Sequence, residues 1–132
     1  MFSLADVDAD SDLDLIVSLA QGVQNQLWIN DGTGAFEPAN QVFAALDSRR
    51  PAVADLDGDG DTDILFPNSN HQPNDIWLND GQGRFGGVVH WIGDSNSTRI
   101  LLGDLDRDGD LDAFELNTYH QPNCVWFNRG AE

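Results

Sequence analysis

The residues most able to do chemistry in this sequence are aspartates packed at alternate positions. One cluster runs from Asp55 to Asp63 as Asp-Leu-Asp-Gly-Asp-Gly-Asp-Thr-Asp, and similar clusters begin at Asp6 and Asp104. If the first Asp is position 1, carboxylates at positions 1, 3 and 5 can converge on one hard cation. Position 7 can add a backbone carbonyl, and position 9 can close the cage. Gly60, at position 6, permits the sharp turn that such a loop needs.

This set of donors favours Ca²⁺ over other metals. Ca²⁺ accepts about six to eight oxygen ligands in a flexible geometry, whereas Mg²⁺ retains its waters and Zn²⁺ prefers His or Cys. Without a cation, five carboxylates within nine residues would repel one another. The predicted side-chain ligands are Asp6, Asp8, Asp10 and Asp14, then Asp55, Asp57, Asp59 and Asp63, then Asp104, Asp106, Asp108 and Asp112, with carbonyls from Asp12, Asp61 and Asp110.

The first loop departs from the other two at position 6, where Ser11 replaces glycine. A left-handed residue that carries a Cβ costs about 1–2 kcal/mol, so this loop is expected to bind its cation more weakly. An alternative is that the loops belong to helix–loop–helix calcium modules, which need an acidic ligand at position 12. Only the third loop has one, because the residues there are Val17, Phe66 and Glu115, and the flanking sequence is strand-like.

The elements that must position these loops repeat with a period of 49 residues. The same interval separates Asp6 from Asp55 and Asp55 from Asp104, and Trp28, Trp77 and Trp126 follow it too. A fixed spacing without insertions indicates that each unit is one structural module. We expect the three tryptophans to form a packing layer between modules.

Each module has short apolar runs bounded by Gly, Asn and Asp, a pattern typical of strands. Runs lie before and after each Asp cluster and around each Trp, and the segments that begin with Asn30-Asp31-Gly32 and Asn79-Asp80-Gly81 read as hairpin turns. A fourth run is expected over residues 36–43 and 85–92. Four strands per module predict an all-β fold of antiparallel β-propeller blades, about three per chain. The expected blades span residues 1–49, 50–98 and 99–132, the last one incomplete.

The combination of Asp-rich loops and Asn-Asp-Gly-x-Gly-x-Phe turns (residues 30–36 and 79–85) resembles the FG-GAP/VCBS repeats of integrin alpha-subunit propellers and many secreted bacterial proteins. The resemblance covers nearly the whole chain. It implies that each Asp loop joins the first and second strands of a blade, and that a complete propeller has about seven blades. It also implies an extracellular or cell-surface module for recognition or scaffolding. Departures are Ser11, Arg129 where Asp80 stands in the second unit, and the absent last strand.

Composition excludes several classes of function. The 132 residues carry a net charge of −17, so a nucleic-acid partner is not expected, because phosphate binding needs a basic surface. No stretch approaches the roughly 20 apolar residues of a membrane-spanning helix, and the first residues show no apolar signal core. The single cysteine, Cys124, cannot form an internal disulfide and is expected to be a packing residue.

A second candidate site is the segment His71-Gln72-Pro73-Asn74, which recurs as residues 120–123. One interpretation is a plain hairpin that holds an Asn of each unit (Asn25, Asn74 and Asn123) in a strained turn conformation. The other is a polar rim for a ligand such as a sugar, with Trp91 or Tyr119 as stacking surfaces. Its candidate ligand-binding residues are His71, Asn74, His120 and Asn123.

The sequence contains no nucleophile elbow, phosphate loop or plausible Cys/His pair, so no enzymatic activity is expected. The leading hypothesis is a calcium-stabilised, non-catalytic extracellular module that binds or scaffolds a protein or glycan. The alternatives are a lectin-like propeller and an accessory domain of a polysaccharide-processing enzyme. About three blades would leave apolar faces uncovered. We therefore expect a homodimer that completes a ring, or a piece of a longer propeller.

Overall fold

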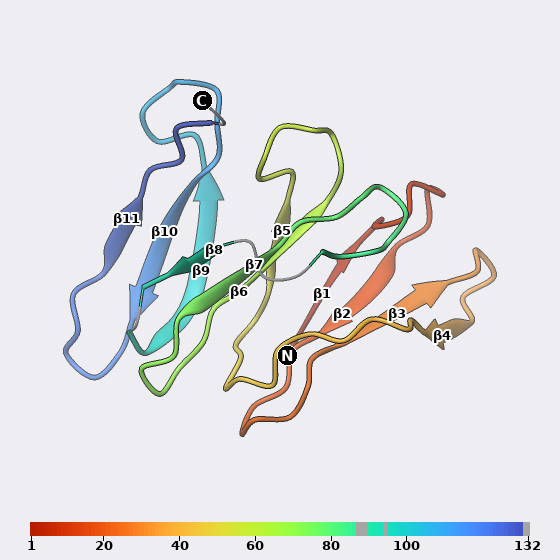
Figure 1. The fold of residues 1–132 in the computed structure, drawn as a ribbon, viewed down its shortest axis with the longest axis horizontal. Coiled ribbons are helices and arrows are strands. Elements are labelled where there is room, and N and C mark those ends of the chain that lie inside the picture. The colour runs from red at the N-terminus through yellow and green to blue at the C-terminus, as the bar shows by residue number, and fades with distance from the viewer. Residues whose placement is uncertain (87–89, 94, 131–132) are drawn as a thin grey trace.

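The computed structural model describes residues 1–86, 90–93 and 95–130, which form three antiparallel sheets and no helix (Figure 1). This confirms the prediction of an all-β fold built from blade-like sheets. The first sheet contains β1 (Phe2–Ala5), β2 (Asp14–Val17), β3 (Gln26–Asn30) and β4 (Phe36–Pro38) in that order; the second contains β5 (Ala52–Ala54), β6 (Asp63–Phe66), β7 (Asn74–Trp77) and β8 (His90–Ile92); the third has the order β11 (Cys124–Trp126), β10 (Asp112–Asn117), β9 (Ser97–Gly103).

The three sheets stand side by side, and neighbouring sheets contact each other through their first strands (Figure 1). Strand β5 contacts both β1 and β9. The Ser3 hydroxyl on β1 donates a hydrogen bond to the Pro51 carbonyl, 2.7 Å away, just before β5. The first strands therefore lie together on one side, and later strands of each sheet are successively farther from them, as in a sector of a propeller. Strand β9 begins at Ser97, so it crosses the repeat boundary expected at 98/99.

The central sheet is covered on both faces, and its sequence reflects this. Ile64, Leu65 and Phe66 on β6 are all buried, whereas the corresponding strand of the first sheet alternates between buried and half-buried residues. A strand with two covered faces reads as a continuous apolar run, because neither side of the pleat meets water.

Aromatic rings fill the junction between the first and second sheets. Phe43 packs against Phe66, Trp77 and Phe85 with ring centroids 5.1 to 5.6 Å apart. At the next junction, Trp126 packs against the cluster formed by Leu65, Ile100 and Ala113. Trp77 and Trp126 thus both face the preceding sheet, which confirms the predicted inter-blade layer for these two residues. Trp28, in the first sheet, is only half-buried.

The expected fourth strands are shorter in the structure than the sequence suggested. In the first unit the strand ends at Pro38, and Phe43 lies outside it. The Ala39 N–H still donates to the Leu27 carbonyl at 2.9 Å, so hydrogen bonding extends one residue past the proline. Burial of Phe43 in the inter-sheet core then determines the path of the segment. In the second unit an isolated bridge joins Asn79 to Phe85, and regular pairing resumes only in β8.

Candidate metal centre

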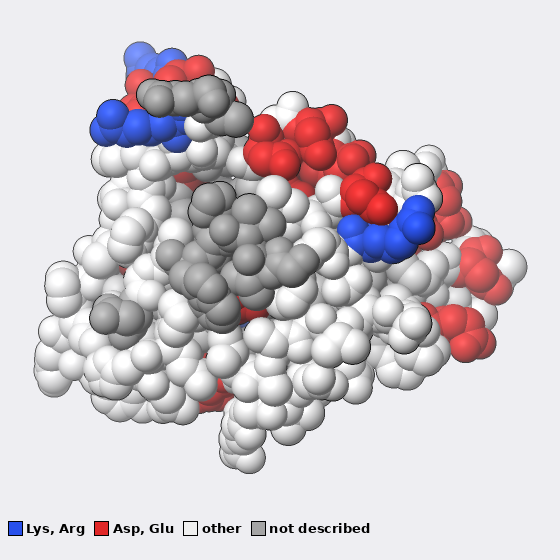
Figure 2. All heavy atoms as spheres, in the orientation of Figure 1, with Lys and Arg blue, Asp and Glu red and all other residues white. Residues whose placement is uncertain are grey.

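The three Asp loops connect the first two strands of each sheet and lie at the same edge of the molecule. Figure 2 shows acidic side chains gathered along this edge. The edge is fixed by topology, because the β1–β2, β5–β6 and β9–β10 connections all occur at the same end of their antiparallel pairs (Figure 1). The loops therefore form a row of acidic sites.

Two left-handed residues shape each loop. The expected turn at position 6 is present, with φ of 77° at Ser11, 97° at Gly60 and 101° at Gly109. Position 4 is left-handed as well, and the sequence analysis missed it. The residues at position 4 are Ala9, Gly58 and Arg107, with φ of 62°, 82° and 68°.

The aspartate at position 9 anchors its loop to the sheet. Asp63 is fully buried, and its two oxygens accept hydrogen bonds from the backbone N–H groups of Leu56 (2.7 Å) and Asn79 (2.9 Å). Asp14 and Asp112 are equally buried and make the equivalent pairs of bonds. This carboxylate therefore has a structural role, fixing the loop against the third strand, that spacing alone did not reveal.

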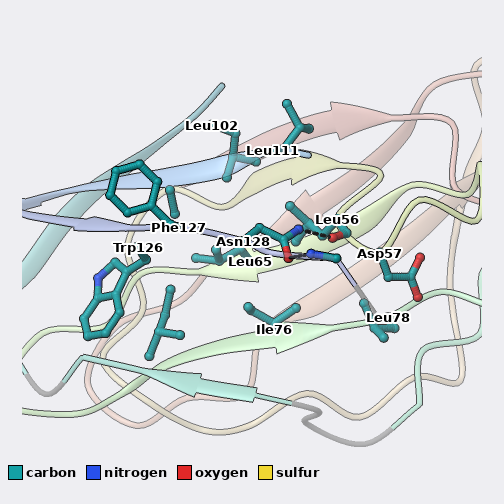
Figure 3. Close-up of a pocket in the computed structure, with 13 residues that line it drawn as sticks. Leu56, Asp57, Leu65, Ile76, Leu78, Leu102, Leu111, Trp126, Phe127 and Asn128 are labelled. Carbon is teal, nitrogen blue, oxygen red and sulfur yellow. Dashed lines mark hydrogen bonds between the residues drawn. The ribbon is translucent and has the colours of Figure 1, made fainter. Parts of the chain in front are cut away.

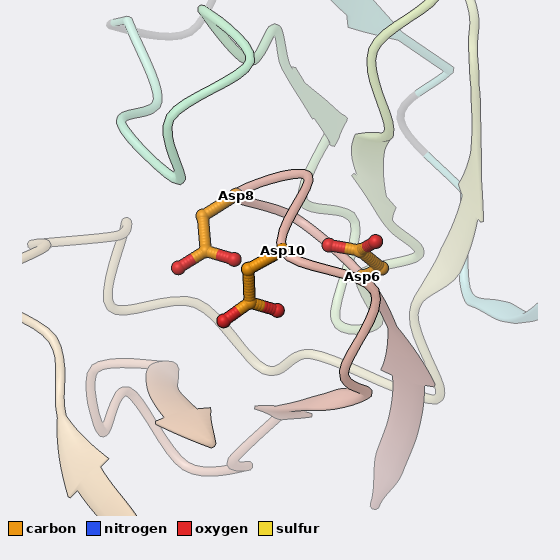
Figure 4. Close-up of side chains that lie close together, drawn as sticks. All are labelled: Asp6, Asp8 and Asp10. Atoms are coloured by element: carbon orange, nitrogen blue, oxygen red, sulfur yellow. The ribbon is translucent and has the colours of Figure 1, made fainter. Parts of the chain in front are cut away.

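Carboxylate oxygens converge in each loop, although the converging set differs. Ligand atoms lie within 4.8 Å of one another in three groups, and the first of these is drawn in Figure 4. Positions 1, 3 and 5 converge in the first and third loops, and positions 1, 3 and 9 in the second. Asp14, Asp59 and Asp112 fall outside these groups. The groups are Asp6, Asp8 and Asp10; Asp55, Asp57 and Asp63; and Asp104, Asp106 and Asp108.

The position 7 side chains turn toward the glycine of the Asn-Asp-Gly turn in their own repeat. A Cβ built on Gly32 would lie 2.5 Å from Asp12 Oδ2, and one built on Gly81 would lie 2.6 Å from Asp61 Oδ2. Asp110 approaches Gly130 in the same way, at 3.0 Å. The turn therefore requires glycine for close approach as well as for its positive φ.

The first loop has oxygens that the protein leaves unpaired. Asp6 Oδ1 and Asp8 Oδ1 are buried atoms with no hydrogen-bond partner among the described residues. A buried carboxylate oxygen without a donor is costly unless a cation supplies the missing partner. All the converging atoms are hard oxygens, the donor type that Ca²⁺ and Mg²⁺ bind. The residues therefore fit a hard divalent cation.

Comparison with protein-family models gives the decisive match. The model for the FG-GAP-like repeat matches residues 6–66 and again residues 55–114. The chain belongs to the FG-GAP-like repeat family. The two matches overlap across the second Asp loop, as expected when one model covers a loop and the start of the next repeat. A comparison with curated proteins finds no match.

Burial raises the pKa of several carboxyls in these FG-GAP-like loops. Desolvation, with the charges of Asp14 and Asp10, raises the pKa of Asp8 above its ordinary value of 3.8. Desolvation is also the main cause of the raised pKa of Asp57, Asp63 and Asp106. These carboxyls therefore hold their protons more tightly than an ordinary Asp does, and a bound cation would compete with the proton.

A chain of hydrogen bonds links each FG-GAP-like loop to the next. The Asn79 side-chain amide donates to the Val7 carbonyl (2.7 Å), at position 2 of the first loop. The backbone N–H of Asn79 donates to Asp63 in the second loop. Asn128 repeats this arrangement between Leu56 (3.0 Å) and Asp112 (2.9 Å). Each asparagine thus joins the anchor of its own loop to the backbone of the preceding loop. In the sequence, the only signal of this role is the 49-residue spacing of Asn79 and Asn128.

The second candidate site lies at the opposite end of the sheets, in the β2–β3, β6–β7 and β10–β11 hairpins. Asn74 is buried, and its Oδ1 accepts the Asn68 N–H at 2.7 Å. Asn123 is exposed and accepts the Asn117 N–H at 3.0 Å. The expectation of strained asparagines is wrong. The left-handed residues of these hairpins are Gln21, Gly22, Asn70, His71, Tyr119 and His120.

The hairpins do not gather the proposed ligand-binding residues into one site. His71 and His120 are exposed, and His71 Nε2 lies 3.4 Å from Asn96 Nδ2. Tyr119 is 81% exposed, and the side chain of Trp91 lies outside the described residues. The two histidines occur in separate sheets, and no described contact brings them together.

The glutamine of each His-Gln-Pro-Asn segment has a structural partner instead. Gln72 Oε1 accepts the Asp47 N–H at 2.7 Å, and Gln121 Oε1 accepts the Asn96 N–H at 2.7 Å. Asp47 and Asn96 are the same repeat position, in the segments that lead into the next sheet. Each glutamine therefore fastens its hairpin to the connection from the preceding sheet, a role missed in the sequence.

A cavity of about 400 Å³ lies between the second and third sheets (Figure 3). Its lining is mostly apolar and includes Leu65, Leu102 and Trp126, while Asp57 and Asn128 are among its few polar residues. Ile92 stands at the repeat position that Phe43 fills in the first junction, so a smaller side chain contributes to the space. A sugar site needs several convergent polar groups, which this lining does not offer.

Proposed function

We propose that this chain is a calcium-binding, non-catalytic FG-GAP-like module that acts as an extracellular binding or scaffold domain. The observation that supports calcium most strongly is the pair of unpaired, buried oxygens on Asp6 and Asp8, in a loop frame that recurs three times. Positions 1 and 3 would hold the cation together with position 5 in the first and third loops and position 9 in the second, and the carbonyl of position 7 would complete each site. Ca²⁺ would supply positive charge to crowded carboxylates and would tie the first strand of each sheet to the second.

The extracellular assignment rests on the family resemblance and on expected affinity. Extracellular calcium modules bind at about 10⁻⁴–10⁻³ M, so such sites fill outside the cell and stay largely empty in cytosol. Among the described residues, no helix is long and apolar enough to cross a membrane.

Calorimetric titration with Ca²⁺, together with melting curves in chelator and in millimolar Ca²⁺, tests the proposal. Binding of Ca²⁺ to the native state stabilises it by mass action, so we expect the melting temperature to rise by many degrees. Asp57→Ala and Asp106→Ala should reduce this shift, and Glu37→Gln, a change on an exposed residue outside the loops, should leave it intact. Identical melting curves in chelator and in Ca²⁺ would rule out the calcium assignment. A sub-micromolar dissociation constant would remove the affinity argument for the extracellular setting.

A lectin function is a second proposal, because His71 and His120 are exposed in these hairpins. A glycan array in the presence of Ca²⁺ separates it from the scaffold function, since no binding at millimolar sugar would exclude it. The accessory role predicts that the gene encodes a polysaccharide-processing catalytic domain beside this sequence. The adjoining gene sequence therefore tests it.

A further inference from the structure

A hollow lies on the inner edge of the row of sheets, where the first strands contact one another. Its volume is about 310 Å³. The lining consists of Ser3 on β1, residues 50–53 at the start of the second sheet and residues 99–102 on β9. We call it the inner hollow. All three sheets of the chain contribute to it through their first strands or the residues just before them.

Two arginines, Arg50 and Arg99, line the inner hollow, and both are exposed. They occupy the same repeat position, 49 residues apart, in neighbouring sheets. The chain has six positively charged side chains against a net charge of −17, so two of them at one hollow form a marked local excess of positive charge. The ion pairs found among the described residues involve Arg49 and Arg84 instead. Neither arginine of the hollow therefore has its charge matched by a carboxylate of the described chain.

The Asp loops are too far away to neutralise these two arginines. Arg50 and Arg99 lie near the start of their strands, and each Asp loop follows the end of its strand. Five residues separate each arginine from the first Asp of the loop that follows, a span of about 16 Å when extended. At physiological ionic strength the screening length is about 8 Å, so salt largely separates the two charged regions.

The arginine position stays open when a following sheet is in place. Arg50 belongs to the second sheet, which the third sheet follows, and it is exposed nonetheless. Arg99 has the equivalent place in the third sheet. A further sheet packed behind the third would therefore leave Arg99 as accessible as Arg50 already is.

The rest of the lining is mostly apolar. Its apolar members are Pro51, Ala52, Val53, Ile100, Leu101 and Leu102. Leu101 is 43% exposed, so it offers a contact surface to a bound molecule. The volume is at the lower end of the range of roughly 300–1,000 Å³ that is usual for small-molecule sites. The combination of an apolar wall and two cationic groups suits a small molecule that has both an anionic and an apolar part.

We propose that the inner hollow binds a small organic anion. Its carboxylate or phosphate head group lies between Arg50 and Arg99, and its apolar part packs against Leu101. Guanidinium groups bind both kinds of head group through paired, charge-assisted hydrogen bonds. Two like charges at one hollow also repel each other, and a bound anion removes that repulsion. The site contains no residue of the Asp loops, so it does not depend on the calcium proposal.

NMR titration of the 132-residue chain in millimolar Ca²⁺ tests the proposal with four compounds. Phenyl phosphate and benzoate carry both parts, benzyl alcohol lacks the charge, and sulfate lacks the apolar part. We expect saturable shifts of the Ala52 and Leu101 amide signals with phenyl phosphate, with benzoate or with both. The tighter of the two identifies the head group. Benzyl alcohol and sulfate should bind at least tenfold more weakly.

Arg50→Gln and Arg99→Gln should each weaken binding about tenfold, the loss expected when one charge-assisted hydrogen bond is removed. Arg84→Gln is the matched control, because it makes the same change of charge at an exposed arginine that pairs with Asp80 outside the hollow. This variant should bind as the unaltered chain does. Without ligand, the Arg50 and Arg99 variants should melt no lower than the unaltered chain, since each removes one of two like charges.

Three results would overturn the proposal. The first is the absence of saturable shifts at the inner hollow with either phenyl phosphate or benzoate. The second is unchanged affinity in the folded Arg50→Gln and Arg99→Gln variants, which would place the anion elsewhere, for example on Ca²⁺ in the Asp loops. The third is equal affinity for benzyl alcohol or for sulfate, which would show that only one of the two parts is recognised. If the anion binds and Ca²⁺ does not, the calcium proposal fails and this one stands.

Discussion

The first and second Asp loops share one nine-residue frame but satisfy their carboxylates differently. In the second loop, Asp55 Oδ1 accepts the Gly58 N–H at 2.7 Å, and Asp57 Oδ1 accepts the Asp59 N–H at 3.3 Å. The first loop lacks both bonds, and the equivalent oxygens, Oδ1 of Asp6 and Oδ1 of Asp8, are the unpaired ones. The second loop thus supplies a backbone donor to one oxygen of each of these two aspartates that stays unpaired in the first loop, although Asp6 Oδ2 there still accepts the Ser11 N–H at 3.0 Å.

The difference coincides with the residues at the two left-handed positions. The second loop has Gly58 and Gly60 there, and the first has Ala9 and Ser11. Non-glycine residues pay a steric cost at positive φ, so the first loop is both more strained and less well hydrogen-bonded. Two effects therefore act in opposite directions in the first loop: strain weakens the binding frame, and unpaired oxygens increase the gain when a cation arrives.

The largest expected effect comes from removing the anchor of a loop. Asp63→Ala would leave one buried N–H group (Asn79) and one partly buried N–H group (Leu56) without acceptors, and a buried one costs about 1–3 kcal/mol. We expect a loss of about 3 kcal/mol or more in the free energy of unfolding, measured by urea denaturation in chelator. Asp14→Ala should cost about as much, because it too would leave one buried N–H group (Val7) and one partly buried N–H group (Asn30) without acceptors. A clearly smaller loss for Asp14→Ala would show that the first loop is anchored less firmly than the second.

The next effect concerns the asparagine that links loops. The Asn79 amide donates to the carbonyls of Val7 (2.7 Å) and Thr62 (3.1 Å), whereas the Asn30 amide has one exposed, 3.3 Å bond to Leu13. Asn79→Ala should destabilise the metal-free protein by about 2 kcal/mol, and Asn30→Ala by less than about 1 kcal/mol. If the link couples the sites, Asn79→Ala also weakens Ca²⁺ binding at the first loop. Calorimetry on a variant in which the other loops are disabled would show no such change if the bond is only structural.

Exchange of the position 6 residues tests the cost of strain directly. Gly60→Ser should destabilise the second loop by about 1–2 kcal/mol, and Ser11→Gly should stabilise the first by a similar or smaller amount. No atom of the described residues lies within 4 Å of a Cβ built on Gly60, so the cost would come from backbone conformation rather than from a clash. Urea denaturation of both variants in chelator is the measurement. A neutral result for both would show that the φ values do not limit stability.

Much of the fold and part of the site could be predicted from the sequence. The 49-residue period and the alternation of short apolar runs with Asn-Asp-Gly turns predicted the sheets, because each signal depends on local backbone preferences. The Asp spacing likewise predicted convergent carboxylates. The fourth strands were predicted too long, because Phe43 leaves the sheet edge for the core between sheets, a tertiary choice that local pattern does not encode.

The contacts between repeats were the part that the sequence did not reveal. Gln72 and Asn79 act on a neighbouring sheet, at Asp47 and at Val7. Such roles depend on how sheets stack, and a periodic residue looks the same whether it serves its own module or the next. Two buried carboxylates of the hairpin side, Asp75 and Glu115, were also missed, and each accepts the indole N–H of a tryptophan in its own sheet.

The smallest effect in the comparison is the pH dependence of the metal-free protein. Burial raises the folded-state pKa of Asp8 and of Asp57 above 3.8, so the folded state holds these protons more tightly than the unfolded chain does. Their contribution to stability is therefore complete below pH 3.8 and is lost as pH rises through the raised pKa values. In chelator, we expect these two groups to make the protein less stable at pH 7 than their neutral equivalents would.

Asp8→Asn and Asp57→Asn separate the two loops in this respect. Each removes one titrating group, so each should flatten the fall in stability between acid and neutral pH, measured by urea denaturation in chelator. Asp8→Asn should give the larger gain at pH 7, because the charges of Asp14 and Asp10 add to desolvation in raising the Asp8 pKa, whereas at Asp57 the Asp59 N–H partly offsets desolvation. An equal gain at both positions would mean that burial alone, and not the neighbouring charges, sets the cost of ionisation. In Ca²⁺ the direction of the pH dependence should reverse, so that stability rises with pH. Protons compete with the cation, and binding strengthens as the carboxyls ionise.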